Sequence, residues 1–276
     1  MRRRLLLYGL ALPLAAALSA AALWRPPADC DTLASSAEIE MRVGLYEEAE
    51  RLCAEVLERE PSHLRALLVS GACAEFRGEK ERACERYRRA LAATDDAAVS
   101  ADLSASLALL ETDLGLREAA AADLRAAEKG PPGLRAKATY AKAVHAQRFG
   151  DPQAARAGLA EAFDLAASDV GLQTGIGERY VELGAREEAL SAFEAAGANG
   201  YAPAIYACAR LKFEGGDVER GLTDLAKLEA RNRGWLRRQM EKDASFWAPI
   251  RERGDLPEGF PRAGEDGRGP RKPGPG

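Results

Sequence analysis

The stretch Gly44-Leu-Tyr-Glu-Glu-Ala49 returns 34 residues later as Gly78-Glu-Lys-Glu-Arg-Ala83. A recurrence at a fixed step of this size indicates a repeat architecture, in which one small unit is stacked on the next. The same frame continues at Gly115, Gly150, Gly184 and Gly216, in steps of 37, 35, 34 and 32 residues. The sequence therefore predicts six units, which begin at residues 30, 64, 101, 136, 170 and 202.

Each unit is predicted to contain two antiparallel helices, because its apolar residues recur at i, i+3, i+4 and i+7. The glycine at the fifteenth place suits a left-handed C-cap that ends the first helix. Small residues at the eighth and twentieth places allow the two helices to approach closely, and larger residues at the twenty-fourth place are expected to fill space toward the next unit. Pro61 and Pro132 fall where second helices should end.

The 34-residue pattern resembles the tetratricopeptide repeat (TPR) family over residues 30 to about 233. The best matches are Gly44 to Ala49 with Pro61, and Gly184-Ala-Arg-Glu-Glu-Ala189 with Phe193. The resemblance implies an all-α, right-handed α-solenoid of about six helical hairpins that binds other proteins. The sixth unit begins within the stretch Gly200-Tyr-Ala-Pro-Ala-Ile-Tyr206. This stretch looks more like a Sel1-like repeat, a relative of the TPR.

Residues 1–27 are predicted to be a signal peptide or a membrane anchor. Arg2, Arg3 and Arg4 precede an uncharged run from Leu5 to Trp24, which is long enough to span a bilayer. Small residues at Ala20 and Ala22 suit cleavage, whereas Trp24 suits an uncleaved anchor. Either alternative places the rest of the chain outside the cytoplasm, anchored to a bacterial-type inner membrane and facing the periplasm, or secreted into the periplasm.

The predicted solenoid, residues 30–252, ends in a C-terminal cap that starts at about residue 234. Trp235, Met240, Phe246, Trp247 and Ile250 form an apolar set suited to one or two short helices that cover the last repeat. Residues 253–276 are rich in glycine, proline and arginine and are predicted to be a disordered tail.

The composition indicates a protein that is neither an enzyme nor a nucleic-acid binder. The net charge of −4 supplies no basic face for phosphates. The two histidines, His63 and His145, lie in different units, and no group of histidine, cysteine or acidic residues has metal-ligand spacing. No catalytic constellation, metal site or cofactor motif is found, so the protein is predicted to be non-enzymatic.

Five cysteines leave at least one thiol unpaired within the chain. Cys73 and Cys84 occupy places ten and twenty-one of the second unit, which face each other across the hairpin. A Cys73–Cys84 disulfide is therefore one alternative in an oxidising compartment. Two small buried thiols are the other.

First helices of TPR arrays line a concave groove, and the resemblance implies that places 2, 5, 9, 12 and 13 project into it. The sequence lacks the lysine and asparagine clamp with which some TPR proteins bind peptide C-termini. The groove is instead mixed in charge and polarity, with aromatic anchors. A position in the core is the alternative for Leu109 and Val144. The candidate protein-binding residues are Arg65, Phe76, Leu109, Tyr140, Val144, Tyr206, Arg210 and Phe213, and Glu178 also belongs to the predicted groove face.

The repeat, the predicted signal or anchor segment and the absence of catalytic motifs together predict a non-enzymatic interaction scaffold. We expect it to hold a segment of a partner protein in the cell envelope. The alternative is an accessory factor that modulates a cell-wall enzyme or binds an envelope polymer, which the Sel1-like unit and the basic tail favour.

Overall fold

The computed structural model describes residues 28–251, which form thirteen α-helices and one 3₁₀ turn, with no strand in that range. Six helical hairpins follow one another, as the repeat predicts. Their first helices are α2 (Cys30–Arg42), α4 (Leu64–Phe76), α6 (Ala97–Asp113), α8 (Arg135–Arg148), α10 (Val170–Glu182) and α12 (Ala202–Glu214). Their second helices are α3 (Tyr46–Arg59), α5 (Lys80–Ala92), α7 (Arg117–Ala127), α9 (Pro152–Leu165), α11 (Arg186–Ala198) and α13 (Val218–Lys242).

The chain divides into two compact units at the Asp95–Asp96 bond. The repeat predicts one solenoid over residues 30–252. The division falls between Gly78 and Gly115, which are separated by the longest step of the repeat, 37 residues. There α6 begins at Ala97 rather than at residue 101, because the Asp96 side chain accepts hydrogen bonds from the backbone N–H groups of Ala98 and Val99. The first unit contains α2 to α5, and the second contains α6 to α14.

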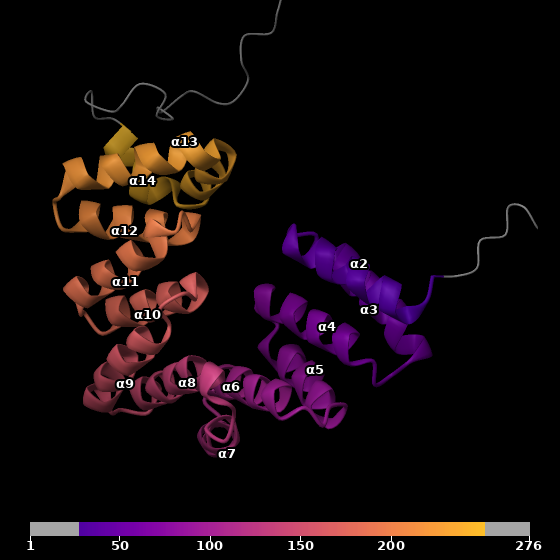
Figure 1. The fold of residues 1–276 in the computed structure, drawn as a ribbon. Coiled ribbons are helices and arrows are strands. Elements are labelled where there is room, and N and C mark those ends of the chain that lie inside the picture. The colour runs from indigo at the N-terminus through magenta and orange to yellow at the C-terminus, as the bar shows by residue number, and fades with distance from the viewer. Residues whose placement is uncertain (1–27, 252–276) are drawn as a thin grey trace, which may run out of the picture. The chain divides into compact units, whose positions relative to one another are not determined.

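In the first unit, α2 packs against α3 and α4, and α4 packs against α5 (Figure 1). Its core is small in side-chain size, with Ala34, Ala37, Ala49, Cys53 and Val56 completely buried. Two hairpins therefore bury a thin layer of apolar side chains between them.

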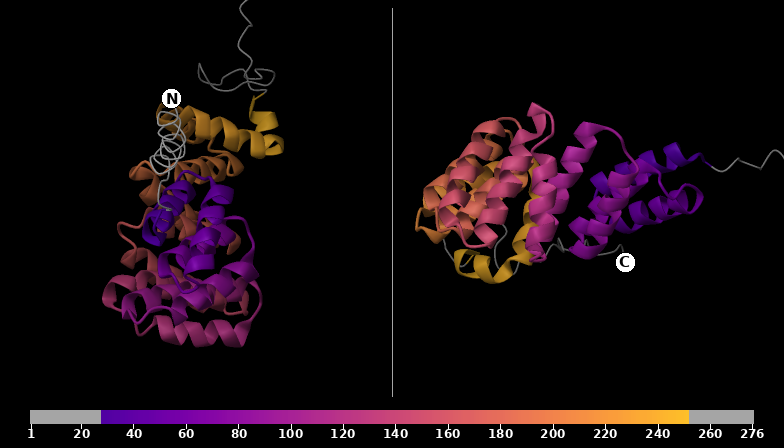
Figure 2. Two further views of the ribbon diagram at one scale, coloured as in Figure 1. Left: turned by 90° about the vertical axis from the view of Figure 1, so that its right-hand side faces the viewer. Right: turned by 90° about the horizontal axis from the view of Figure 1, so that it is seen from below.

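In the second unit, four hairpins and a cap are stacked in chain order, as Figures 1 and 2 show from three sides. Each second helix packs against its own first helix, and α11 also packs against α12 of the next hairpin. One continuous cluster joins α8 to α12 through Leu159, Ile176, Tyr180, Phe193 and Leu211. The 3₁₀ turn Pro132–Leu134 and Pro131 separate α7 from α8, where the sequence predicts a helix to end.

All six glycines at the fifteenth place have positive φ, from 68° at Gly184 to 94° at Gly150. At Gly44 the φ of 85° lets the backbone N–H of the next residue, Leu45, reach the carbonyl of Glu40. This closing bond satisfies a carbonyl that the helix end leaves without a partner. The predicted left-handed C-caps are confirmed.

Small residues at the eighth and twentieth places are buried in the hairpins. Their alanines, such as Ala37, Ala49 and Ala189, are completely buried. In the two units that carry glycine at the eighth place, the twenty-fourth place is aromatic: a Cβ on Gly71 would lie 2.4 Å from the Tyr87 ring, and one on Gly177 would lie 2.6 Å from the Phe193 ring. These rings therefore pack on the glycine of their own hairpin, a contact that the sequence analysis does not anticipate.

The array ends in a cap made by the last part of α13 and by α14 (Ala244–Arg251). Asn232, with φ −152° and ψ 63°, interrupts α13, and its side chain accepts a hydrogen bond from the backbone N–H of Trp235. A new helical segment thus starts after Asn232, near the cap start predicted at residue 234. Trp247 of α14 is completely buried and belongs to the cluster that includes Tyr206, Leu236 and Met240.

Within residues 28–251, no helix has both the length and the apolar character needed to cross a bilayer. The predicted signal or anchor segment, residues 1–27, and the predicted tail, residues 253–276, lie outside the described residues.

Candidate functional site

A cavity of about 620 Å³ opens between α10, α12 and the start of the cap. We call it the groove cavity, since the first helices of the last two repeats form most of its walls. Glu178, Val181 and Glu182 come from α10, Arg210 and Glu214 from α12, and Trp235 from the cap. Three carboxylates and one guanidinium therefore share a pocket with an exposed valine and an aromatic wall.

The back of the groove cavity is held by Tyr206, which is 4% exposed. Its hydroxyl donates to Asp243 Oδ2 at 2.7 Å and accepts from Trp247 Nε1 at 2.5 Å. Burial, and the hydrogen bond to the Asp243 carboxylate, raise the pKa of Tyr206. The cap is thereby tied to the fifth place of the last repeat.

Arg210 is also engaged by the cap. Its guanidinium lies 4.8 Å from the centre of the Phe246 ring and 3.4 Å from Asp243, and it lies 3.7 Å from Glu214 on its own helix. Phe213 packs edge-on against Trp247, with ring centres 5.4 Å apart. The predicted binding residues of the last repeat thus serve mainly to seat the cap.

A polar ladder joins the first helices α6, α8 and α10. Arg179 lies 3.7 Å from Asp113 of α6, hydrogen-bonds Tyr140 of α8, and lies 3.0 Å from Glu182 on α10. Gln147 of α8 donates to Glu182 at 2.9 Å. This ladder ties α10, one wall of the groove cavity, to α6 and α8, and only Tyr140 of its members is among the predicted site residues.

Glu178 lies outside this ladder, with no ion-pair partner within 4 Å in the described part of the chain. Its side chain reaches solvent, yet the surrounding groove walls desolvate it and raise its pKa, and the nearby Glu182 adds to the rise while Arg179 opposes it. A carboxylate in this position favours a cation in contact with it.

The predicted site residues differ in burial and in the residues that they contact. Val144 and Tyr206 are both buried: Val144 belongs to the core, and Tyr206 lies beneath the cap at the back of the groove cavity. Leu109 and Tyr140 are half-buried. Arg65 and Phe76 lie in the first unit: Arg65 donates to Ser35 at 2.5 Å, and Phe76, 67% exposed, stacks on Tyr46 with ring centres 5.4 Å apart.

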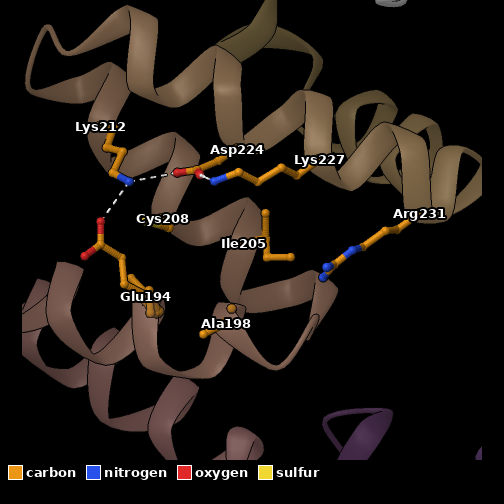
Figure 3. Close-up of a pocket in the computed structure, with 10 residues that line it drawn as sticks. Glu194, Ala198, Ile205, Cys208, Lys212, Asp224, Lys227 and Arg231 are labelled. Carbon is orange, nitrogen blue, oxygen red and sulfur yellow. Dashed lines mark hydrogen bonds and ion pairs between the residues drawn. The ribbon is translucent and has the colours of Figure 1, made fainter.

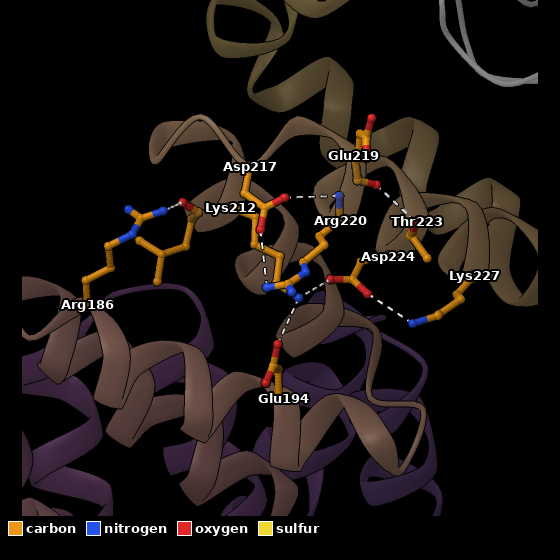
Figure 4. A network of polar contacts seen from close by, with 10 residues as sticks. Arg186, Glu194, Lys212, Asp217, Glu219, Arg220, Thr223, Asp224 and Lys227 are labelled. Carbon is orange, nitrogen blue, oxygen red and sulfur yellow. Dashed lines mark hydrogen bonds and ion pairs between the residues drawn. The ribbon is translucent and has the colours of Figure 1, made fainter.

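A second cavity, of about 380 Å³, lies between α11, α12 and α13 (Figure 3). Lys212 lines it, with its ammonium 2.9 Å from Glu194 and 2.8 Å from Asp224. Asp224 also binds Lys227 at 3.2 Å, so the network joins three helices (Figure 4). Both carboxylates form ion pairs with the Lys212 ammonium, so this network serves to hold the three helices together.

The structure has no disulfide between Cys73 and Cys84. Cys73 is completely buried in one cluster with Cys53, whereas Cys84 is partly exposed. Burial raises the pKa of Cys53 to about 12 and that of Cys73 to about 11. Cys73 thus fills a small buried position, whereas Cys84 does not, and the Cys73–Cys84 disulfide stays a prediction for an oxidising compartment.

The solved structures that resemble this chain decide its fold. A tetratricopeptide repeat protein from Parabacteroides merdae aligns with a TM-score of 0.56 at 18% identity, over 78% of this chain and 84% of that chain. The chain has the TPR fold. Cut9, in its complex with Hcn1 from the APC/C, aligns with a TM-score of 0.54 at 18% identity, over 76% of this chain but 41% of its own.

The type IV pilus biogenesis factor PilW aligns with this chain at a TM-score of 0.51 and 17% identity, over 73% of this chain and 92% of that one. At such identities the likeness concerns the fold alone. No protein-family model and no curated protein matches the sequence. Across residues 28–251, no three histidine, cysteine or acidic side chains gather to hold a metal ion.

Proposed function

We propose that this TPR protein is a non-enzymatic scaffold that binds a segment of a partner protein in the groove cavity, on the outer side of a bacterial-type inner membrane. The groove cavity carries the proposal, because it combines an open volume with an exposed apolar residue, an aromatic wall and charged groups. Anchors of this kind surrounded by polar groups are typical of surfaces that bind peptide segments.

A photoreactive amino acid at Val181 tests the groove cavity directly. Val181 is 42% exposed and lines the cavity, while Leu165, at the end of α9, is 44% exposed and lies outside it. We expect a protein adduct from position 181 in cells and none from position 165. Equal labelling at both positions, or none at 181, would contradict binding in the groove cavity.

The same experiment separates the alternative function. An adduct at position 181 that a cell-wall hydrolase converts from a smear into a discrete band would show a bound envelope polymer. A discrete adduct of constant mass after that treatment supports a protein segment.

The proposed location depends on residues 1–27 and is tested separately. The N-terminus of the mature protein distinguishes the two alternatives, since a start near Leu23 means a cleaved signal and an intact Met1 means an anchor. A reporter that is active only after export, fused to the C-terminus, should be active in either case, and inactivity would overturn the proposed location.

A further inference from the structure

The groove cavity has an unbalanced charge. Glu178, Glu182 and Glu214 line it together with a single cation, Arg210. Arg210 is itself held by Asp243 of the cap, at 3.4 Å, and by Glu214, at 3.7 Å. The positive charge in the cavity is therefore already committed to carboxylates of this chain.

Glu182 is likewise committed, because it binds Arg179 at 3.0 Å and accepts a hydrogen bond from Gln147. Glu178 differs from its neighbours in having no such ion pair within the described residues. The charged residues that line the cavity with Glu178 are Glu182, Arg210 and Glu214, and Arg179 is its neighbour in the sequence. The one guanidinium adjacent in sequence, Arg179, instead points to Asp113, Tyr140 and Glu182.

Apolar groups lie beside these carboxylates. Val181 is 42% exposed, and Trp235 is half-buried with one edge against Tyr206, at a ring-centre distance of 5.8 Å. A long side chain with an aliphatic stem and a cationic head can lie along valine and tryptophan while its head reaches a carboxylate. An aromatic wall also attracts a cation over its face.

We infer that the groove cavity accepts a lysine or arginine side chain of the partner segment, with its charge against Glu178 and its stem along Val181 and Trp235. This inference rests on the proposed function and specifies the partner as a basic, partly apolar peptide segment. The charge of the cavity disfavours the acidic C-terminal peptides that a lysine clamp would bind, because the uncompensated carboxylate of Glu178 would repel them.

Selection of a random displayed peptide library on the full chain tests the inference without knowledge of the natural partner. We expect the selected peptides to be enriched in lysine or arginine next to apolar residues. In fluorescence anisotropy, Glu178→Gln should weaken their binding about tenfold, the usual loss for one charge-assisted contact. Glu187→Gln, an exposed acid at the start of α11, should leave binding unchanged.

A double-mutant cycle makes the pairing specific. Replacing the basic residue of the peptide by alanine should cost about as much as Glu178→Gln, and the two changes together should cost little more than either alone. High salt should weaken wild-type binding more than binding to Glu178→Gln.

The outcomes distinguish this inference from the proposed function. Peptides that bind without a basic residue, or that ignore Glu178→Gln, overturn the inference, while an adduct at position 181 still supports the scaffold. No selected peptide and no adduct at position 181 overturns both. Loss of self-association in Glu178→Gln, measured by sedimentation, would show that a second copy fills the cavity and would also overturn the inference.

Discussion

At the scale of single residues, the fold depends on the absence of side chains at defined places. Gly71 and Gly177 lie in the middle of helices, where glycine costs about 1 kcal/mol relative to alanine. Both are kept small by an aromatic ring of the paired helix, Tyr87 or Phe193, which occupies the space of a Cβ. Packing therefore outweighs helix propensity at these two positions.

Gly177→Ala should lower the free energy of unfolding by about 1–3 kcal/mol, because overpacking against the Phe193 ring exceeds the gain in helix propensity. Gly234→Ala is the matched control: it lies in a helix too, and its nearest neighbour is the mobile end of Arg238, at 3.6 Å. Urea denaturation should show opposite signs for the two variants. A stabilised Gly177→Ala variant would contradict the packing argument.

The buried thiols of Cys53 and Cys73 make stability depend on alkaline pH. Burial raises their pKa in the folded state to about 12 and about 11, above the ordinary value of 9.0. Their contribution is therefore complete below pH 9 and is lost as pH rises toward 11 or 12, since only the unfolded thiols ionise there. At pH 10 each thiol should reduce the unfolding free energy by about 1.4 kcal/mol.

Denaturant unfolding between pH 8 and pH 11 would measure this loss of unfolding free energy, which is about 1.4 kcal/mol per thiol at one pH unit above the ordinary pKa. The Cys53→Ala and Cys73→Ala variants should each remove part of the slope, whereas Cys84→Ala, at a partly exposed position, should remove less. Equal slopes in all variants would show that these thiols do not carry the effect.

At the scale of helices, ion pairs fix the positions of neighbouring helices where the small apolar core does not. The buried Lys212 holds α11 and α13 onto α12 through Glu194 and Asp224. Arg186 of α11 adds a hydrogen bond to the Leu211 carbonyl of α12. These contacts tie the last two repeats to each other.

Lys212→Met should destabilise the protein by about 2 kcal/mol, because Asp224, whose side chain is 14% exposed, would keep its charge with one partner fewer. Lys227→Met is the control: its side chain is 62% exposed, and it binds the same Asp224. We expect it to change the midpoint of thermal unfolding little. A loss for Lys227→Met as large as for Lys212→Met would refute a special role for the buried lysine.

The cap shows where the sequence pattern stops being informative. Place numbers in the repeat predict that Tyr206, Arg210 and Phe213 face the groove; Tyr206 and Arg210 line the groove cavity, while Phe213 packs against Trp247. What the pattern does not show is that residues after Asn232 fold back over them, through Asp243, Phe246 and Trp247. The repeat period predicts the helices and the turns between them, because each turn depends on a local glycine. The position of α10 in the groove wall depends instead on contacts between side chains that are distant in the sequence, such as Arg179 and Asp113.

At the scale of the whole molecule, the division at Asp95–Asp96 separates two hairpins from four hairpins and a cap. Stacked repeats gain stability from each interface between neighbours, and about three are needed before an array is stable. The sequence predicts the six hairpins but not this division, because only a longer step between Gly78 and Gly115 accompanies it.

Residues 96–251, expressed alone, should therefore fold, since they contain the continuous cluster of α8 to α12 and the buried Trp247 of the cap. Circular dichroism should show a helical spectrum and a single cooperative thermal transition. Residues 28–95, with two hairpins and a core of alanine, valine and cysteine, should melt at a lower temperature or with little cooperativity. The groove cavity lies wholly within residues 96–251, so the isolated second unit should also retain the peptide affinity of the full chain. If the isolated second unit were unfolded while the full chain is folded, the second unit would need the first for its stability, contrary to this account.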